Sequence, residues 1–528
     1  MNEDVTRPIG DAPSLPPVPS GKGAARQGRT RRQRRESRSL AAVLGLTAVN
    51  AVVPGTAFLA SGRRRLGAVV LVLFVLLVGA GVWLATAGRR TAVRLAVDSS
   101  SLNWIVAALV VLAVAWVAVV VTGYRSLLPR HSSAPRHAVG AVLVALLVAG
   151  IAYPAYRVGE VAVAQRGLLD GVFADDRESA TVEDTPDPFG SKERVNVLLL
   201  GGDGGEGREG VRTDTVIVAS VETETGETTL FSLPRNLEDL PFPADSPLAE
   251  IYPEGFESGS ESESLLNSVY RNGPADHPDV LGPTDDPGAD FLKLGVGEAL
   301  GLHIDYFVLV NLDGFSRLVD ALGGITVNVN YYVPINGITG EELPDDYIAP
   351  GPDQHLDGYL ALQFARGRYG LTDYDRMDRQ RCTIKAIVDE ADPITLLEQY
   401  QELAATTQDI VSTDIPRSAL DDFVDLAFLV KDAEIRSVVF DTSLIDPAYP
   451  DYDRMRQIVE DTLSGAAGTS APAPAPGTSA SGAEVPNGTP PAPVEGAPTA
   501  TEVDDACAFN PAQAQAALAA GEPPSRNG

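Results

Sequence analysis

Two aspartates and several arginines occupy positions from which their side chains could share one site. Asp203 follows one apolar run, Asp214 begins the next, and Arg235 ends a third. Arg366 and Arg368 are two residues apart in the stretch QFARGRYG, in a chain whose formal net charge is −30. Carboxylate oxygens are the ligands that Mg²⁺ prefers, and guanidinium groups bind phosphate oxygens in pairs. Together these residue types are typical of a magnesium–pyrophosphate site.

Each of these residues also has a simpler interpretation when it is taken singly. An aspartate at the end of a strand is more often a turn or capping residue. An Arg-X-Arg pair on an acidic protein more often forms ion pairs with carboxylates. The chain offers no candidate Ser-His or Cys-His pair for nucleophilic catalysis. The functional interpretation therefore depends on the side chains converging at one place.

Three predicted strands would bring the residues together. These apolar runs span 194–201, 213–221 and 228–236. If hairpin-like connections join them, the chain reverses direction twice. The end of the first strand, the start of the second and the end of the third then share one edge of a sheet. We therefore expect Asp203, Asp214 and Arg235 to converge, with Arg212 beside Asp214 on the same side of an extended chain.

The rest of the domain alternates between helical and extended patterns. We predict helices over 290–302, 313–324 and 375–391, and strands over 303–312 and 325–333. The segment that carries Arg366 and Arg368 is predicted to be a helix or strand with an extended end, which places both arginines on one face. This alternation implies an α/β domain with helices packed on a central sheet.

Four apolar stretches precede this domain. They span about 40–60, 66–87, 102–123 and 138–154, and most are close to the ~20 residues that cross a bilayer. The first is the weakest, because it contains Asn50 and the pair Pro54-Gly55. An array of this kind predicts a permanent anchor in a lipid bilayer rather than a cleaved signal peptide.

Arginines between the stretches predict the orientation of the chain. The rule that basic loops stay inside places three groups in the cytoplasm: the tract 26–38, Arg63 to Arg65, and the loop with Arg125, Arg130 and Arg136. All three can be inside only if the first stretch is re-entrant or interfacial and the other three cross. Everything after about residue 155 then lies outside the cytoplasm. The acidic balance argues against a nucleic-acid partner.

The chain is expected to divide into five regions. These are a basic cytoplasmic tail (1–39), a transmembrane region (40–157), a stalk (158–190), an extracytoplasmic catalytic domain (191–463) and a Pro/Ala/Gly-rich disordered tail (464–528), in which one short piece could form a small helix. Cys382 lies in the domain and Cys507 in the tail. In an oxidising compartment they could form a disulfide that joins the tail to the domain, and two unpaired thiols are the alternative.

The domain resembles the LytR-CpsA-Psr family over about residues 194–463. The resemblance is carried, in chain order, by NVLLLGGDGGEGREGVRTDTVIVASVETETGETTLFSLPRNL, LLNSVYRNGP, LGLHIDYFVLVNLDGFSRLVDALGGITVNV and QHLDGYLALQFARGRYGLTDYDRMDRQRCTIKAIVD. It implies a three-layer α/β/α sandwich with a central mixed sheet and a hydrophobic pocket for a lipid tail. It also implies a Mg²⁺-dependent, membrane-anchored phosphotransferase. Such an enzyme moves a cell-wall glycopolymer from a polyprenyl-pyrophosphate carrier onto a peptidoglycan hydroxyl and releases polyprenyl phosphate.

The same resemblance implies roles for individual residues. Asp203 and Asp214 match magnesium-linked aspartates of the family. Its pyrophosphate-binding positions match Arg212, Arg235, Arg366, Arg368, Arg379 and Gln380. Asp373 matches an acidic position that helps to deprotonate the acceptor, and the nearby Asp375 is an alternative base. The expected catalytic residues are therefore Arg235, Arg366, Arg368 and Asp373.

Some features of the sequence leave alternatives open. Asn236 stands where the family usually has aspartate, and Thr213 where it usually has serine. Asn267 and Tyr270 match a family motif whose role we leave open. Two other classes of function remain, namely a polyprenyl-pyrophosphate hydrolase with water as the acceptor and a non-catalytic membrane sensor or regulator.

Overall fold

The structure is a computed structural model of the chain. It describes residues 39–128, 134–173, 178–182, 189, 192–203, 211–391, 411–465 and 500–527. The arginine tract 26–38 and the Pro/Ala/Gly-rich segment 466–499 lie outside the described residues, as do parts of the predicted stalk. The chain forms two compact units, and the globular domain belongs to the second.

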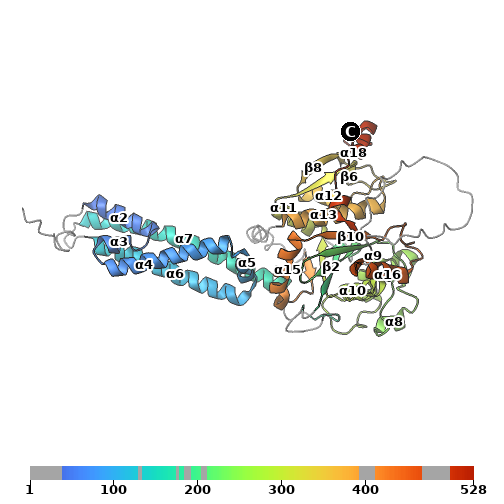
Figure 1. The fold of residues 1–528 in the computed structure, drawn as a ribbon, viewed down its shortest axis with the longest axis horizontal. Coiled ribbons are helices and arrows are strands. Elements are labelled where there is room, and N and C mark those ends of the chain that lie inside the picture. The colour runs from blue at the N-terminus through green and yellow to red at the C-terminus, as the bar shows by residue number, and fades with distance from the viewer. Residues whose placement is uncertain are drawn as a thin grey trace, which may run out of the picture. The chain divides into compact units, whose positions relative to one another are not determined.

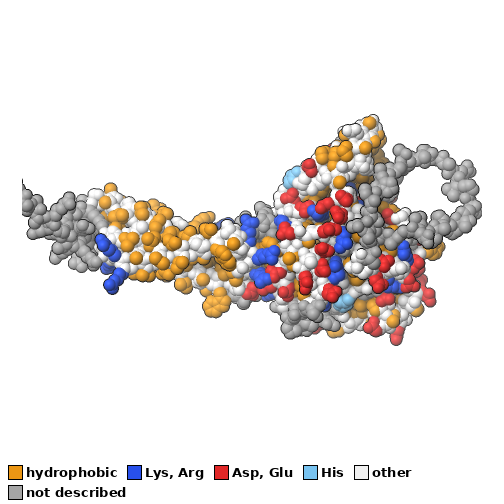
Figure 2. All heavy atoms as spheres, in the orientation of Figure 1, with side chains coloured by type: hydrophobic (Ala, Val, Ile, Leu, Met, Phe, Trp, Pro, Cys, Tyr) orange, Lys and Arg blue, Asp and Glu red, His pale blue; other side chains and the backbone are white. Residues whose placement is uncertain are grey.

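Three helices near the N-terminus are long and apolar enough to cross a membrane. They are α4 (Arg64–Ala85), α6 (Ser99–Leu127) and α7 (Ala134–Val172), and the short helix α5 (Arg89–Val97) lies between the first two in sequence. Hydrophobic side chains cover much of the surface of these helices, whereas acidic side chains gather on the globular domain (Figure 2). The helix α7 continues through Pro154 to Val172, so the first part of the predicted stalk is helical.

The first apolar stretch does not form one helix. It is divided into α2 (Leu40–Val52), with 13 residues, and α3 (Thr56–Ala60), with 5, and each is shorter than the ~20 residues that span a bilayer. Gly55 between them has a φ of 99°, a left-handed conformation that glycine adopts without a steric cost. The Asn50 side chain accepts hydrogen bonds from the N–H groups of Gly55 and Ala57. The residues that weaken this stretch in the sequence therefore lie at the break, where Asn50 accepts two hydrogen bonds and Gly55 has the left-handed conformation.

A seven-stranded mixed sheet forms the centre of the globular domain. Its strands are β1 (Arg194–Gly202), β2 (Thr213–Glu222), β3 (Thr228–Leu233), β4 (Tyr306–Asn311), β9 (Val411–Thr413), β10 (Ile435–Val439) and β11 (Thr501–Glu502). They are arranged in the order β11-β10-β3-β2-β1-β4-β9. The pairs β1–β2 and β2–β3 are antiparallel, whereas β1–β4 and β3–β10 are parallel. The predicted hairpin connections of the first three strands are confirmed.

Helices cover both faces of this sheet (Figure 1). One face carries α9 (Leu266–Asp276), α10 (Pro287–Leu300) and α16 (Tyr452–Leu463), and the other carries α11 (Leu312–Leu322), α12 (Gly358–Arg366), α13 (Asp373–Glu390) and α15 (Leu420–Asp432). Because side chains alternate along a strand, Val216 and Val218 of β2 enter one core while Ile217 and Ala219 enter the other. The predicted three-layer α/β/α sandwich with a mixed sheet is confirmed.

Two small antiparallel ladders extend the layer of α11 to α13. β5 (Ile325–Val329) pairs with β8 (Gly351–Leu356), and β6 (Val333–Ile335) pairs with β7 (Asp346–Ile348). The single strand predicted over 325–333 is therefore divided between two ladders. Short helices complete the described domain: α8 (Pro247–Ile251), η1 (Glu261–Glu263), η3 (Arg417–Ala419), α17 (Val503–Ala506) and α18 (Pro511–Ala520).

The tail predicted over 464–528 contains a folded part, and the small helix expected within it is present as α18. Strand β11 pairs with the edge strand β10, and the helices α17 and α18 follow it. Val503 is fully buried in the core on the α13 side of the sheet. Few residues in this segment are apolar and buried. Its composition therefore resembles that of the low-complexity stretch before it, and it did not predict the strand or its packing on the sheet.

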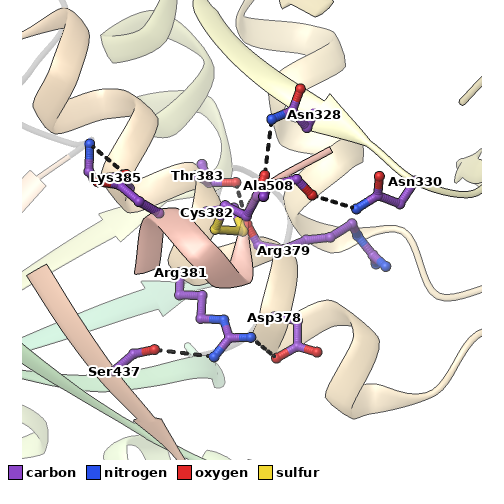
Figure 3. The surroundings of a disulfide bond; sticks show 12 residues. Asn328, Asn330, Asp378, Arg379, Arg381, Cys382, Thr383, Lys385, Ser437 and Ala508 are labelled. Carbon is purple, nitrogen blue, oxygen red and sulfur yellow. Dashed lines mark hydrogen bonds and ion pairs between the residues drawn. A yellow bond between two sulfur atoms is a disulfide. The ribbon is translucent and has the colours of Figure 1, made fainter. Parts of the chain in front are cut away.

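A disulfide joins this segment to the domain (Figure 3). Cys507 follows α17 and is bonded to Cys382 on α13, with the two Cα atoms 5.6 Å apart. The carbonyl oxygen of Cys507 also accepts a hydrogen bond from the side chain of Asn328. The bridge thus connects the tail to a helix that packs on the central sheet.

We expect the double substitution C382S/C507S to lower the free energy of unfolding by about 2–4 kcal/mol, because the bridge restricts the unfolded chain across a sequence separation of 125 residues. Urea denaturation of the purified protein, with and without a thiol reductant, measures this. The reductant should destabilise the wild type to the level of the variant and leave the variant unchanged. Equal stabilities of the oxidised wild type and the variant would contradict the expectation.

Candidate functional site

A cavity of about 800 Å³ lies between the central sheet and the helices α11, α12 and α13. Most of its wall is apolar and includes Leu199, Ile217, Val308, Phe315, Leu318, Leu362, Ile384 and Ile387. One part of the wall is charged and is formed by Asp203, Asp214, Arg235, Arg366, Arg368, Asp373 and Arg376. The apolar residues of β1, β2 and β4 come from within the strands, whereas Asp203, Asp214 and Arg235 lie at strand ends. The cavity therefore combines an apolar chamber with a charged edge.

The ends of the first three strands meet at this edge. Asp203 and Arg212 are paired through their backbones, because the N–H of Asp203 donates to the carbonyl of Arg212 at 3.1 Å. The N–H of Arg212 donates to the Asp203 carboxylate at 2.9 Å. On the next strand pair, Nη1 of Arg235 donates to Oδ1 of Asp214 at 2.9 Å. The predicted convergence of Asp203, Asp214 and Arg235 on one edge is confirmed.

The Arg212 side chain points to a different partner. Its guanidinium forms an ion pair with Glu263 at 2.5 Å, and Glu263 also pairs with Arg271. A hydrogen bond from Asn272 lowers the pKa of Glu263; burial acts in the opposite direction, and the charges of Arg212 and Arg271 lower the pKa further. Arg212 is not among the described residues that line the cavity. Its backbone positions Asp203, and direct binding of pyrophosphate by its side chain stays a prediction.

Arg366 and Arg368 reach the cavity from the C-terminal end of α12. The helix begins at Asp357, whose side chain accepts a hydrogen bond from the N–H of Leu360 at 2.8 Å, and it ends at Arg366. Gly367 follows, and a Cβ at this position would lie 2.5 Å from the carbonyl oxygen of Pro334 on β6. Only glycine permits this close approach. Both arginines line the cavity, as the shared face predicted from the sequence requires.

Asp373 lies among three arginines. Its carboxylate is 2.9 Å from Nη2 of Arg376, 3.4 Å from Nε of Arg235 and 3.5 Å from Nη1 of Arg368. A carboxylate at the centre of such a group offsets the mutual repulsion of the guanidinium groups. Asp373 therefore joins residues from β3, α12 and α13 in one cluster.

Arg376 belongs to this cluster, although the sequence analysis did not single it out. It is 3% exposed and lines the cavity. Its Nη1 donates to the carbonyl of Asp214 at 2.8 Å, and its Nε has no hydrogen-bond partner among the described residues. Burial lowers the pKa of Arg376, and the charges of Asp373 and Asp214 act in the opposite direction. Helical spacing could have identified it, because Asp373, Arg376 and Gln380 are three and four residues apart on one face.

Arg379 contacts the residues at the end of α12. Its Nε donates to the carbonyl of Phe364 at 2.6 Å, its Nη1 donates to the Tyr331 hydroxyl at 2.8 Å, and its Nη2 donates to the carbonyl of Gly367. It is buried and is not among the described residues that line the cavity. Through these contacts Arg379 holds the end of α12 that carries Arg366 and Arg368, the clamp arginines. Direct binding of pyrophosphate by Arg379 stays a prediction. Its neighbour Gln380 does line the cavity and donates to the Thr215 hydroxyl at 2.7 Å.

Three further candidates from the sequence are now placed. Asp375 forms a capping box with Thr372 at the start of α13, so its carboxylate is used in holding the helix end. Asn267 is 3.4 Å from Oδ1 of Asp214 and thus contacts the site. Tyr270 donates instead to Asp286 at 2.9 Å. Of the two residues whose role was left open, only Asn267 supports the charged edge.

The two aspartates at the edge could hold a cation together with a phosphate ligand. Burial acts to raise the pKa of Asp214, but Arg235, the charge of Arg376 and the hydrogen bond from Asn267 outweigh it and hold the pKa below its ordinary value. Among the described residues, no group of three or more His, Cys, Asp or Glu is placed to hold a metal ion. Mg²⁺ commonly takes one or two carboxylates and completes its coordination with water and substrate phosphates. Asp203 and Asp214 fit this arrangement.

Several curated proteins are similar to this chain. The polyisoprenyl-teichoic acid–peptidoglycan teichoic acid transferase TagU of Enterococcus faecalis (strain ATCC 700802 / V583) is 32% identical over 231 residues, which cover 43% of this chain and 63% of that protein. The protein of the same name from Halalkalibacterium halodurans is 26% identical, with 53% of this chain and 79% of that protein covered. Biofilm regulatory protein A of Streptococcus mutans serotype c is 25% identical, with 44% and 53% covered. The chain thus spans less than two thirds of the first of these relatives.

Solved structures are also similar to part of the chain. B. subtilis TagV is 22% identical with a TM-score of 0.35, and the match covers 51% of this chain and 97% of that one. TagT bound to LIIa-WTA is 18% identical with a TM-score of 0.35, and the match covers 55% and 96%.

A family comparison covers the whole cavity region. The model of the LytR_cpsA_psr family matches residues 172–452, which are just over half of the chain. The match includes all three strand ends, the end of α12 and the start of α13. This chain is therefore a member of the LytR_cpsA_psr family.

Proposed function

We propose that this protein is a membrane-anchored, Mg²⁺-dependent phosphotransferase. It moves a cell-wall glycopolymer from a polyprenyl-pyrophosphate carrier onto a peptidoglycan hydroxyl and releases polyprenyl phosphate. The observation that carries the proposal is the direct junction of an arginine cluster with an apolar cavity. The names of two relatives, which describe transfer of teichoic acid from a polyisoprenyl carrier to peptidoglycan, support it.

The apolar part of the cavity is suited to a polyprenyl chain. Its volume of about 800 Å³ and its wall of Leu, Ile, Val and Phe side chains favour a hydrocarbon ligand over a polar one. Each buried CH₂ group contributes about 0.8 kcal/mol to binding. A lipid tail therefore supplies affinity here, while the charged edge selects the head group.

The charged edge is suited to a pyrophosphate. Guanidinium groups bind phosphate oxygens in pairs and keep their charge in buried surroundings. Arg235 lines the cavity from the end of β3, and Arg366 and Arg368 line it from the end of α12, so they could contact the ligand from two sides. Asp373, which is itself held by Arg376, fixes Arg235 and Arg368 before the ligand arrives, and this reduces the cost of ordering them on binding.

In the proposed reaction, a peptidoglycan hydroxyl attacks the phosphorus that carries the glycopolymer. A new P–O bond forms, and the bond from that phosphorus to the bridging oxygen breaks. The electron pair stays on polyprenyl phosphate, whose growing charge Arg235, Arg366 and Arg368 offset. A Mg²⁺ ion held by Asp203 and Asp214 would supply further neutralisation of phosphate charge. Asp373 accepts the proton of the attacking hydroxyl.

The surroundings of Asp373 support its role in proton transfer. Its Oδ2 accepts the hydrogen bond from Arg376, whereas its Oδ1 has ion-pair contacts at 3.4 and 3.5 Å and no hydrogen bond within the described part of the chain. Oδ1 can therefore receive a proton without breaking a hydrogen bond. Because Arg235 and Arg368 are beside it, the base lies next to the groups that bind the phosphate.

We also propose that the domain lies outside the cytoplasm. Three helices, α4, α6 and α7, are able to cross the membrane, while the broken first stretch lies within or against one leaflet. This arrangement keeps the basic tract 26–38 and Arg63 to Arg65 on the cytoplasmic side. An odd number of crossings then places the domain on the side where peptidoglycan is found.

Replacing Arg366 or Arg368 by alanine should lower the rate of glycopolymer transfer about 10²-fold or more, because each arginine offsets charge that develops on the leaving phosphate. The assay follows polymer-linked glycan with the full-length protein in membranes. Arg454→Ala on α16 is the matched control, because this half-buried arginine is not among the described residues that line the cavity, and its side chain has a weak contact of 3.5 Å with Gln457. Transfer near the wild-type rate in folded R366A or R368A would contradict the proposed site. Release of free polymer phosphate without polymer-linked glycan in the wild type would indicate the hydrolase instead.

Replacing Asp214 by asparagine should abolish the Mg²⁺-dependent part of donor binding, because the amide keeps the size of the side chain and loses its charge. Titration of farnesyl pyrophosphate with Mg²⁺ and with EDTA measures this. In the wild type, the pKa of Asp214 lies below its ordinary value of 3.8, so this carboxylate is ionised at the neutral pH of the titration. The stability that this carboxylate contributes is lost only as the pH falls through that lowered pKa. Equal Mg²⁺ dependence in D214N would rule out Asp214 as a ligand.

The orientation is tested by protease accessibility in intact spheroplasts. An external protease should cleave epitope-tagged protein within the globular domain and leave a tag placed before residue 26 intact. After lysis, the protease should also remove the tag placed before residue 26. Cleavage of the N-terminal tag in intact spheroplasts would contradict the proposed topology.

A further inference from the structure

The segment 500–527 connects the edge of the sheet to the wall of the cavity. Strand β11 fixes its start on β10, and the disulfide of Cys507 fixes it on α13. Asn330 then donates to the carbonyl of Ala508 at 3.2 Å and accepts from the N–H of Asn510 at 2.8 Å (Figure 3). These contacts hold the segment against β5 before it reaches α18. None of the functions described above uses this part of the chain.

Arg526 ends this connection with four contacts to one loop. Its backbone N–H donates to the carbonyl of Pro344 at 2.8 Å, and its side-chain Nε donates to the carbonyl of Leu343 at 3.0 Å. Its guanidinium also pairs with Glu342 at 3.0 Å and with Asp345 at 3.2 Å. Arg526 therefore binds both the backbone and the side chains of residues 342–345.

Asp345 transmits this contact to the cavity. The side chain of Asn336 donates to Oδ2 of Asp345 at 2.8 Å. Asn336 has a φ of 58°, a left-handed conformation that asparagine tolerates better than most residues. It begins the run 336–339, the cavity loop, all of whose residues line the cavity. Within this loop, Ile338 is 53% exposed and presents an apolar side chain to the cavity edge.

The cavity loop is also connected to the helix that carries the clamp arginines. The N–H of Asn336 donates to Oε1 of Gln363 at 3.1 Å. Gln363 is 3% exposed, lines the cavity and precedes Arg366 by three residues on α12. A continuous series of contacts thus runs from Arg526 through Asp345 and Asn336 to the helix of the phosphate clamp.

These contacts have a local rather than a global effect. The side chain of Arg526 is 43% exposed, and its partners Glu342 and Asp345 are 50% and 38% exposed. Exposed ion pairs of this kind contribute little to the stability of a whole protein. They can still decide how often a short loop opens, because local opening involves far fewer contacts than global unfolding.

We propose that Arg526 is a positioning residue for the cavity: it holds the cavity loop in place through Asp345 and Asn336 and thereby sets how tightly the cavity encloses an apolar chain. The effect of Arg526 on the cavity loop does not depend on which reaction the protein catalyses. Its effect on the binding of a lipid donor rests on the proposed function. Removing the guanidinium leaves the reacting groups unchanged and loosens one wall of the apolar chamber.

Hydrogen–deuterium exchange of the full-length protein tests the effect on the loop. In R526A, the amides of Asn336, Ile338 and Asp345 should exchange about three- to tenfold faster, while amides of β1 and β2 should not change. R526K keeps a positive charge but loses the Nε hydrogen bond, so its loop should exchange at a rate between those of the wild type and R526A. R454A is the matched control and should behave as the wild type. Wild-type exchange of the loop in R526A would overturn the proposal.

A double-mutant cycle tests the route through Asp345. D345N keeps an oxygen that can accept from Asn336 but loses the charge that pairs with Arg526. If the contact acts through this pair, the effects of R526A and D345N on loop exchange should be clearly less than additive in the double variant. Additive effects would overturn the proposed route.

Binding of two lipid probes tests the effect on the ligand. Farnesyl pyrophosphate and undecaprenyl pyrophosphate share a head group and differ in chain length. R526A should weaken binding of the long probe about three- to tenfold and that of the short probe less, and it should raise KM for the donor with little change in kcat. A wild type that binds neither probe would contradict the proposed function itself. A wild type that binds both probes, with R526A indistinguishable from it, would overturn the role of Arg526 alone.

Discussion

The candidate site depends on the placement of one carboxylate among several cations. Asp373 contacts Arg235, Arg368 and Arg376, which come from the end of β3, the segment after α12 and the first turn of α13. Without this carboxylate, three guanidinium groups would repel one another in a partly buried space. Asp214 compensates the same cluster from the other side, through Arg235 and through its backbone carbonyl on Arg376. The clamp is therefore assembled before any phosphate binds, and its three arginines still outnumber its two aspartates, which leaves positive charge for an anionic ligand.

The apolar cavity follows from the way the same elements pack. The strands bury one set of side chains under α9, α10 and α16 and present the alternate set to the other face. There, α13 crosses with Ile384 and Ile387 toward the sheet and with Asp373 and Arg376 toward the strand ends. One helix thus supplies both the apolar wall and the charged edge. An amphipathic ligand with an anionic head and a hydrocarbon tail matches this distribution, which is why the pyrophosphate and the lipid belong to a single proposal.

Much of this arrangement could be predicted from the sequence, and the omissions have physical causes. Apolar runs and turn residues were enough to predict the hairpins that bring Asp203, Asp214 and Arg235 together. Arg376 was not singled out because no motif marks it, and only its spacing of three residues from Asp373 identifies it. The ion pair of Arg212 with Glu263 could not be predicted, because Glu263 lies 51 residues further along the chain in the short helix η1. The role of Arg526 could not be inferred, since four contacts with one remote loop leave no pattern in the local sequence.

We propose that the arginine cluster holds the pyrophosphate of a lipid whose chain fills the adjoining cavity. An experimental structure of the full-length protein with Mg²⁺ and undecaprenyl pyrophosphate would test this placement. We expect phosphate density in contact with Arg235, Arg366 and Arg368, and hydrocarbon density beside Phe315 and Ile384. Phosphate density at another place on the domain, or an empty cavity beside a bound lipid, would rule this placement out.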